Sequence, residues 1–211
     1  MPPWIVNAYY DPSMNEFVFP LAQLLPPALD LSASAGANWG ALGATLGHEM
    51  SHGYDDEGSQ YDAAGNLKSW RTESVQKEFF KRAQCYVEQA NTFEALPGLF
   101  VNGEVTLGEN LADQGGTKFA YLTYKKEAAK RGYSAPDFVG FNEEQQFFLS
   151  FAQSWCGKMT PEALRMQVQS DPHPPTEFRV NMVLKNMQPF REAFSCAEGT
   201  NMAPINTCLL W

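Results

Sequence analysis

One five-residue stretch, His48-Glu49-Met50-Ser51-His52, restricts what this chain can fold into more than any other feature. It matches the pattern H-E-x-x-H, in which two histidines four residues apart share one face of a helix and can bind one metal ion. Glu49 points to an adjacent face, where it could take a proton from water without being a ligand. Such a pattern arises by chance in on the order of one chain in a hundred of this length. The stretch therefore predicts a helix and suggests a zinc site that the rest of the chain must complete.

Length, composition and charge set outer limits. The chain has 211 residues, of which 44% are hydrophobic and 13% aromatic, enough for one domain with a sizeable core. Its net charge of -9 argues against nucleic acid as the main partner, because phosphate binding requires clustered lysines and arginines. No apolar run is long enough to span a membrane, and the first residues lack the pattern of a signal peptide. We expect one domain over residues 1–211, whose start is similar to the interior of a longer protein.

Hydrophobic periodicity and turn residues predict a mainly helical chain with a small β element at its start. Residues 4–10 and 16–19 are rich in β-branched and aromatic types around a turn, which predicts a β-hairpin. Helices are expected over residues 39–54, 72–92, 107–131, 142–156, 160–169, 176–186 and 188–194.

The segments between these elements are expected to be irregular. Residues 20–38 and 56–69 have the composition of connecting loops, and the prolines within 171–175 exclude a helix there. Three glycines in the first predicted helix, Gly40, Gly43 and Gly47, lower its intrinsic helix propensity. We interpret them as sites of close packing against a neighbouring element.

A catalytic zinc ion needs a third protein ligand and an open position for water. His173 is the remaining histidine. The alternative is a carboxylate from Gly108-Glu109-Asn110-Leu111-Ala112-Asp113, where Glu109 and Asp113 share one helix face. One of these two could bind the metal while the other accepts the free N–H of a metal-binding histidine, which fixes the tautomer. The residues alone leave the choice of third ligand open.

The four cysteines are Cys85, Cys156, Cys196 and Cys208, and none forms a C-x-x-C pair. A zinc ribbon or a C-x-x-C redox motif is therefore not indicated. An even count permits two disulfides, but composition alone is equally compatible with buried free thiols.

The two motifs in sequence, His48-Glu49-Met50-Ser51-His52-Gly53-Tyr54-Asp55-Asp56 and Gly108-Glu109-Asn110-Leu111-Ala112-Asp113-Gln114-Gly115-Gly116, resemble the paired signature of the neprilysin and endothelin-converting-enzyme family of zinc endopeptidases. Further blocks resemble that family in the same order, at residues 6–10, 19–20, 26–27, 151–156, 171–175, 178–181 and 208–211. The resemblance covers essentially the whole chain. It implies a thermolysin-like zincin (gluzincin) catalytic domain that binds one Zn²⁺ ion and hydrolyses peptide bonds in oligopeptides.

The resemblance also assigns the residues of the metal site. It implies His48, His52 and Glu109 as zinc ligands and Glu49 as the general base. Asp113 and Asp55 would support the ligands, with Asp113 counted among the catalytic residues.

Residues outside the metal site would act on the substrate. By the same resemblance, His173 stabilises the oxyanion of the tetrahedral intermediate, with Asp171 orienting it. Asn7 and Ala8 would bind the extended backbone of the peptide, as a strand can. Arg179 would bind a substrate carbonyl or pair with an acid such as Asp171 or Asp113. Trp155 would line the pocket for the residue after the cleaved bond.

The resemblance further implies that Cys85 pairs with Cys208. Cys156 and Cys196 would pair with cysteines in an N-terminal lobe of the same parent chain, which these 211 residues lack. The expected location is extracellular or in the lumen of the secretory pathway, including the ectodomain of a membrane-anchored parent. Without the lobe, the alternative is a zinc- or peptide-binding module without turnover. A structural metal site would need a fourth protein ligand, and the intact Glu49 argues against it.

Overall fold

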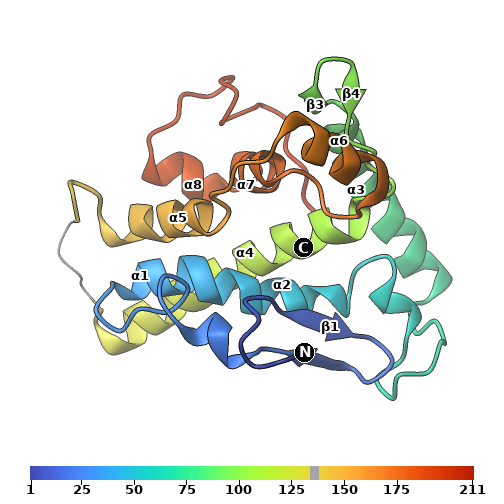
Figure 1. Cartoon of the computed structure of the whole chain (residues 1–211), viewed down its shortest axis with the longest axis horizontal. Coiled ribbons are helices and arrows are strands. Elements are labelled where there is room, and N and C mark those ends of the chain that lie inside the picture. The colour runs from blue at the N-terminus through green and yellow to red at the C-terminus, as the bar shows by residue number, and fades with distance from the viewer. Residues whose placement is uncertain (134–137) are drawn as a thin grey trace.

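The computed structural model describes residues 1–133 and 138–211, and these are mainly helical (Figure 1). The expected single domain also includes residues 134–137, which lie outside the described residues. The helices are α1 (Ala35–Asn38), α2 (Ala44–His52), α3 (Glu73–Asn91), α4 (Leu107–Arg131), α5 (Glu143–Ser154), α6 (Pro161–Ser170), α7 (Thr176–Lys185) and α8 (Gln188–Ala193). Shorter turns are 3₁₀-helical, η1 (Leu21–Leu24) and η3 (Gly58–Gln60), or π-helical, η2 (Trp39–Gly43). The prediction of a mainly α fold with a small β element is confirmed.

The described strands form two antiparallel hairpins. The first pairs β1 (Tyr9–Asp11) with β2 (Glu16–Val18), with Tyr10 opposite Phe17. The second pairs β3 (Glu94–Leu96) with β4 (Leu99–Phe100) around Gly98, which has a φ of +73°. The first hairpin was predicted but is shorter than expected, since its first strand begins at Tyr9. The second was not predicted, because two or three residues per strand are too few to show an alternating pattern.

Helix starts follow the sequence signals closely. Thr72 caps α3 by accepting a hydrogen bond from the backbone of Val75, and Thr160 caps α6 in the same way. Asn142 and Gln145 form a reciprocal capping box at the start of α5. These side chains satisfy backbone N–H groups that a helix start leaves without partners, which is why these helices begin where predicted.

The expectation of a loop over residues 20–38 is wrong in part, because the segment contains η1 and α1. Ser34 caps α1 by accepting a hydrogen bond from the backbone of Ala37. The backbone N–H of Gly36 also donates to Glu143 Oε1 at the start of α5, at 3.2 Å. A contact over more than a hundred residues therefore supports this short helix, and sequence periodicity does not reveal such contacts.

Helices α2 and α4 cross with their backbones in contact, and Figure 1 shows them side by side through the middle of the molecule. A Cβ atom on Gly47 would lie 2.5 Å from the carbonyl oxygen of Gly116, and one on Gly116 would lie 2.3 Å from the backbone nitrogen of His48. Only glycine fits at such an approach. The expected close packing at Gly47 is confirmed, and it fixes the two motif-bearing helices against each other.

The core joins α3, α4, α5 and α7 through aromatic side chains. Tyr121 of α4 stacks on Phe148 of α5 with ring centroids 5.4 Å apart, and Tyr124 stacks on Phe147 at 5.8 Å. Phe147, Phe148 and Phe178 are almost fully buried. Each such side chain contributes about 1.5–3 kcal/mol through burial, so these aromatic contacts hold α4 and α5 together.

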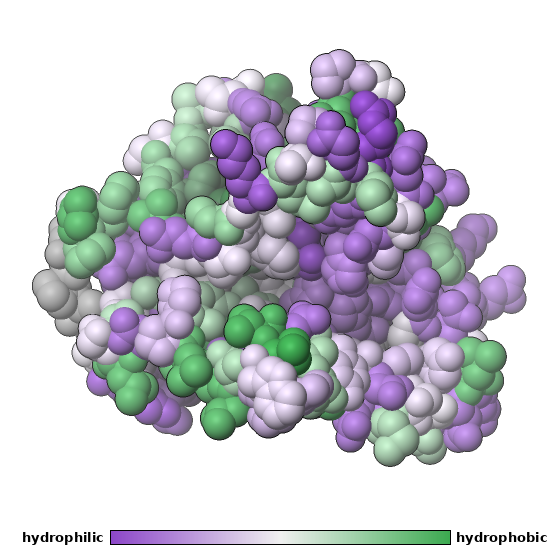
Figure 2. All heavy atoms as spheres, in the orientation of Figure 1, coloured by the Kyte–Doolittle hydropathy of each residue, from purple (hydrophilic) through white to green (hydrophobic). Residues whose placement is uncertain are grey.

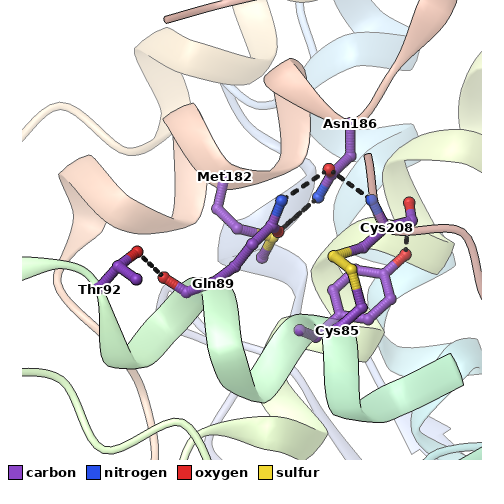
Figure 3. The surroundings of a disulfide bond; sticks show 7 residues. Cys85, Gln89, Thr92, Met182, Asn186 and Cys208 are labelled. Atoms are coloured by element: carbon purple, nitrogen blue, oxygen red, sulfur yellow. Dashed lines mark hydrogen bonds between the residues drawn. A yellow bond between two sulfur atoms is a disulfide. The ribbon is translucent and has the colours of Figure 1, made fainter. Parts of the chain in front are cut away.

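A disulfide between Cys85 and Cys208 ties the C-terminal tail to α3, as the resemblance implied (Figure 3). Next to it, Asn186 Oδ1 accepts hydrogen bonds from Gln89 Nε2 and from the backbone N–H of Cys208, each at 3.0 Å (Figure 3). Cys156 and Cys196 are free thiols. Among the described residues, no helix combines the length and apolar character needed to cross a membrane.

Candidate active site

The crossing of α2 and α4 brings both sequence motifs to one point. The Nε2 atoms of His48 and His52 lie 3.0 Å apart. Glu109 places one carboxylate oxygen 3.4 Å from His48 Nε2 and the other 3.5 Å from His52 Nε2. The three side chains are 12–19% exposed, so they form a partly shielded cluster that solvent can still reach. Two imidazoles and a carboxylate converging in this way match the ligand set of a catalytic zinc site.

A carboxylate lies beside the opposite nitrogen of each ring. His48 Nδ1 lies 2.8 Å from Asp113 Oδ1, and His52 Nδ1 lies 2.7 Å from Asp55 Oδ2. Asp55 is itself fixed, because its Oδ1 accepts the backbone N–H groups of Glu57 and Gly58. Carboxylates at both Nδ1 atoms favour the tautomers whose Nε2 lone pairs are free. Two facing Nε2 atoms at 3.0 Å repel unless a proton or a metal ion lies between them, so the residues fit a metal ion.

The charges of the cluster shift its protonation strongly. Burial alone would lower the pKa of His48, but hydrogen bonding to Asp113 and Glu109, together with their charges, raises it to about 9. Burial would likewise raise the pKa of Glu109, yet His48 and Arg179 lower it to about 2. Glu109 is thus a carboxylate at neutral pH. A metal ion that binds His48 must displace a proton from the His48 ring.

Glu49 lies beside the two histidines. One donor atom from each of His48, Glu49 and His52 can be chosen so that all three lie within 4.8 Å of one another. Glu109 has carboxylate oxygens 3.4 and 3.5 Å from the two Nε2 atoms, so it too is close enough to both histidines to share an ion with them. Glu49 is 5% exposed, and this burial raises the pKa of its carboxyl group. A buried carboxylate of raised pKa next to a metal position is suited to accept a proton.

Arg179 of α7 links the carboxylates of the site. Its Nε and Nη2 atoms donate to the two oxygens of Asp113 at 2.7 and 2.8 Å, and Nη2 also donates to Glu109 Oε2 at 3.0 Å. The sequence left Asp171 and Asp113 as acidic partners of Arg179, and these hydrogen bonds are to Asp113. Trp155, at the end of α5, lies with its ring 4.0 Å from the guanidinium carbon. Arg179 therefore neutralises Asp113 while lying close to Trp155.

His173 approaches the cluster from the turn after α6. Its Nε2 lies 3.2 Å from Glu109 Oε1, and its Nδ1 lies 2.6 Å from Asp171 Oδ1. Asp171 Oδ1 also accepts the backbone N–H of His173 at 2.8 Å. These hydrogen bonds outweigh burial and lower the pKa of Asp171. The structure thus brings the histidine and its acidic partner next to Glu109.

The first hairpin lies against the end of α2. A Cβ atom on Gly53, the residue after His52, would lie 3.1 Å from the hydroxyl of Tyr10 in β1. Asn7 and Ala8 directly precede β1 and are exposed and half-buried, respectively. Figure 2 shows this face of the molecule hollowed across its middle, with hydrophilic side chains gathered toward the right of the hollow. The predicted substrate strand therefore lies next to the helix that carries the histidines.

Two contributors to the site were not foreseen. Gly116 permits the helix crossing, and its signal is a glycine pair inside a long predicted helix. Gln167 of α6 donates hydrogen bonds to the carbonyl oxygens of His173 and Pro174. A glutamine on an amphipathic helix gives no such signal, because polar residues on helix surfaces are common.

Comparisons with known proteins agree with this geometry. The family described as "Peptidase family M13" matches residues 7–210. The "Endothelin-converting enzyme homolog" of Locusta migratoria is 42% identical over 212 residues, which cover 100% of this chain and 29% of that protein. "Endothelin-converting enzyme 1" of Homo sapiens is also 42% identical, over 100% of this chain and 27% of its own length. The chain thus spans less than a third of these curated relatives.

Solved structures also match nearly the whole chain. The Mycobacterium tuberculosis zinc metalloprotease Zmp1 in complex with inhibitor is 39% identical with a TM-score of 0.89, over 96% of this chain and 31% of that one. A chain of a "Haemonchus galactose containing glycoprotein complex" is 36% identical with a TM-score of 0.91, over 99% of this chain and 35% of that one.

Proposed function

The chain belongs to peptidase family M13, and we propose that it is the catalytic part of a zinc-dependent endopeptidase that hydrolyses peptide bonds in oligopeptides. The family membership confirms the resemblance to neprilysin and endothelin-converting enzymes, and the structural neighbours confirm the zincin fold. One observation carries the proposal: the Nε2 atoms of His48 and His52 face each other at 3.0 Å beside the carboxylate of Glu109.

In this proposal His48, His52 and Glu109 hold a single Zn²⁺ ion. When bound, zinc lowers the pKa of a water molecule toward about 7 and polarises a peptide carbonyl. Asp113 and Asp55 orient the two imidazoles through Nδ1, and Arg179 balances the charge of Asp113.

Glu49 is proposed as the general base. It takes a proton from the attacking water and later gives it to the leaving amine, which is general acid–base catalysis by one carboxyl group. Its burial supports this role, since a raised pKa strengthens the carboxylate as a base.

His173 is proposed to stabilise the oxyanion that develops on the attacked carbonyl. Asp171 holds the ring through Nδ1, so Nε2 faces the ligand cluster, where it can donate to that oxygen. Such a donor acts most strongly in the transition state, because the negative charge develops there.

Substrate binding is proposed to use the elements around the cluster. Asn7 and Ala8 would pair with the extended peptide backbone, as an added strand does. Arg179 would donate from Nη1, which makes none of the hydrogen bonds described above, to a substrate carbonyl. Trp155 would line the pocket for the residue after the cleaved bond.

The remainder of a longer parent protein is proposed as a partner, since the chain spans 27–29% of the curated relatives above. An N-terminal lobe of that parent would cover the site and supply cysteines for Cys156 and Cys196, which are free in this structure. The Cys85–Cys208 disulfide supports an extracellular or secretory-lumen location, because disulfides persist in oxidising compartments.

The decisive test replaces Glu49 with Gln in the zinc-loaded chain and measures cleavage of short apolar peptides. We expect kcat to fall by about 10²–10⁴-fold, the contribution typical of general acid–base catalysis, while bound zinc stays at one ion per chain. The matched control is Glu57→Gln, which alters an exposed carboxylate eight residues away and should leave cleavage unchanged.

The alternative function predicts a different result. A zinc- or peptide-binding module would bind one zinc ion, would cleave no peptide as wild type, and would show no effect of Glu49→Gln. A chelator control tests the metal dependence that both cases share, since cleavage that continues without metal would contradict both.

A further inference from the structure

The turn that carries His173 has little regular structure of its own. It follows α6 and contains prolines at positions 172, 174 and 175, which remove backbone N–H donors. The side chains of His173 and Asp171 are 48% and 45% exposed, so burial does not hold them in place. Pro174, in contrast, is almost fully buried and anchors one end of the turn. The position of His173 therefore depends on specific hydrogen bonds.

Those hydrogen bonds reach His173 from two sides. On one side, Asp171 Oδ1 accepts a hydrogen bond from the backbone N–H of His173 and is hydrogen-bonded to its ring Nδ1. On the other side, Gln167 Nε2 donates a hydrogen bond to the carbonyl oxygen of His173 at 3.1 Å and another to that of Pro174 at 3.4 Å. One amide group thus joins two successive carbonyls of the turn to α6.

We propose that Gln167 is a positioning residue, which holds the His173 turn so that the imidazole faces the metal ligands. This inference rests on the proposed function, in which His173 meets the oxyanion. Without Gln167, Asp171 would still bind the ring, but the peptide unit after His173 could rotate. The imidazole would then spend less time 3.2 Å from Glu109 Oε1.

A purely structural role explains these contacts less well. Helix α6 has no buried residue, so Gln167 is not a core side chain that the helix needs for stability. The neighbouring Gln169 lies exposed on the same helix, although it is chemically identical. What distinguishes the two glutamines is that Gln167 donates hydrogen bonds to the turn that carries His173.

The experiment compares Gln167→Leu with the matched control Gln169→Leu in the zinc-loaded full chain. Gln167→Leu keeps a side chain of similar size but removes the donor, and Gln167→Lys restores a donor. We expect kcat to fall by about tenfold in Gln167→Leu with little change in KM, since misplacing an oxyanion donor acts on the transition state. Gln169→Leu should match wild type, and Gln167→Lys should recover most of the loss.

A second measurement does not depend on turnover. The chain has three histidines, so selective ¹⁵N labelling gives imidazole spectra that His173→Gln assigns directly. We expect Gln167→Leu to broaden or shift the His173 signals while those of His48 and His52 stay in place.

Each outcome has a defined meaning. If wild type does not cleave peptides, the proposed function fails, and the imidazole spectra alone decide whether Gln167 holds His173. Unchanged His173 signals in Gln167→Leu would overturn the inference in either case. So would a wild-type kcat, a loss confined to KM, or a Gln167→Lys variant as impaired as Gln167→Leu.

Discussion

The crossing of α2 and α4 and the turn that carries His173 meet at Glu109, yet they are built in opposite ways. In the crossing, His48 is 12% exposed and Asp113 2%, and both belong to helices whose backbones touch at Gly47. In the turn, His173 and Asp171 are almost half exposed and are held by a few hydrogen bonds. The proposed metal ligands are thus fixed by burial and packing, whereas the residue proposed to meet the substrate keeps access to solvent.

The contrast follows from what each part must do. A metal site of fixed geometry requires ligands on rigid elements, and packed helices provide them. A group that contacts a peptide must lie at the surface of the hollow, where the substrate can reach it. An aspartate should therefore contribute more to the free energy of unfolding in the crossing, as Asp113, than in the turn, as Asp171.

Asp113→Ala and Asp171→Ala offer the strongest test of this difference. Removing Asp113 breaks buried ion pairs with both Arg179 and His48, which keep contact with Glu109, so we expect the free energy of unfolding to fall by about 3–5 kcal/mol. Removing Asp171 takes away a largely exposed contact, for which we expect a loss below about 1 kcal/mol. Urea denaturation of the metal-free variants measures both values.

The two variants should also differ in zinc affinity and in turnover. Asp113→Ala should weaken zinc binding about 10–100-fold, as the loss of a group that orients a ligand does. Asp171→Ala should keep its zinc affinity and lose kcat. Equal losses of stability in the two variants would show that the turn is as integral to the fold as the crossing.

Gly47→Ala tests the crossing itself, with a smaller expected effect. The added Cβ would lie 2.5 Å from the Gly116 carbonyl oxygen, so the two helix backbones must separate. We expect a loss of about 1–3 kcal/mol, typical of overpacking, together with weaker zinc binding because His48 follows Gly47 directly.

Gly157→Ala provides the control for the glycine change. An added Cβ there would have its nearest neighbour, the Trp155 carbonyl oxygen, at 3.9 Å. We expect a change within about 0.5 kcal/mol, as for most surface substitutions. If Gly47→Ala behaves like Gly157→Ala in calorimetry, the backbone contact is not what fixes the ligands.

The sequence predicted the crossing better than the turn. His48 and His52 share a helix face by spacing, as do Glu109 and Asp113, so local geometry was enough to group them once two helices were assumed. Gly47, with Gly40 and Gly43, also indicated close packing against a neighbouring element. The residues alone left the third ligand open between His173 and a carboxylate, because spacing cannot place a turn relative to a helix pair.

Other features depend on contacts that a sequence pattern does not contain. Helix α1 is supported by a hydrogen bond from Gly36 to Glu143, and the Gln167 contact joins a helix to a turn of no fixed geometry. Both pairings are set by tertiary structure, which overrides local propensity in short elements. Residues that share a face of one long helix were therefore predictable, and the hydrogen bonds between segments far apart in the sequence were not.

The last test changes pH instead of a residue, because over the neutral to alkaline range the pKa shift described for the crossing concerns one residue, His48. Without metal, its pKa in the folded chain is about 9, above its usual 6.5. Its stabilising contribution is thus complete below pH 6.5 and is lost as pH rises through 9. The pKa of Glu109 is about 2, below its usual 4.5, so its contribution is lost as pH falls from 4.5 toward 2.

The metal-free chain should therefore be most stable between about pH 4.5 and 6.5 as far as these two groups decide it. Zinc should remove the alkaline decline, because a metal-bound histidine is neutral and no longer carries the proton. Guanidinium denaturation at pH 6, 7.5 and 9, with chelator and with zinc, measures this difference. His48→Gln without metal should lack the decline, and a metal-free wild type that grows more stable toward pH 9 would contradict the charge network assigned to the crossing.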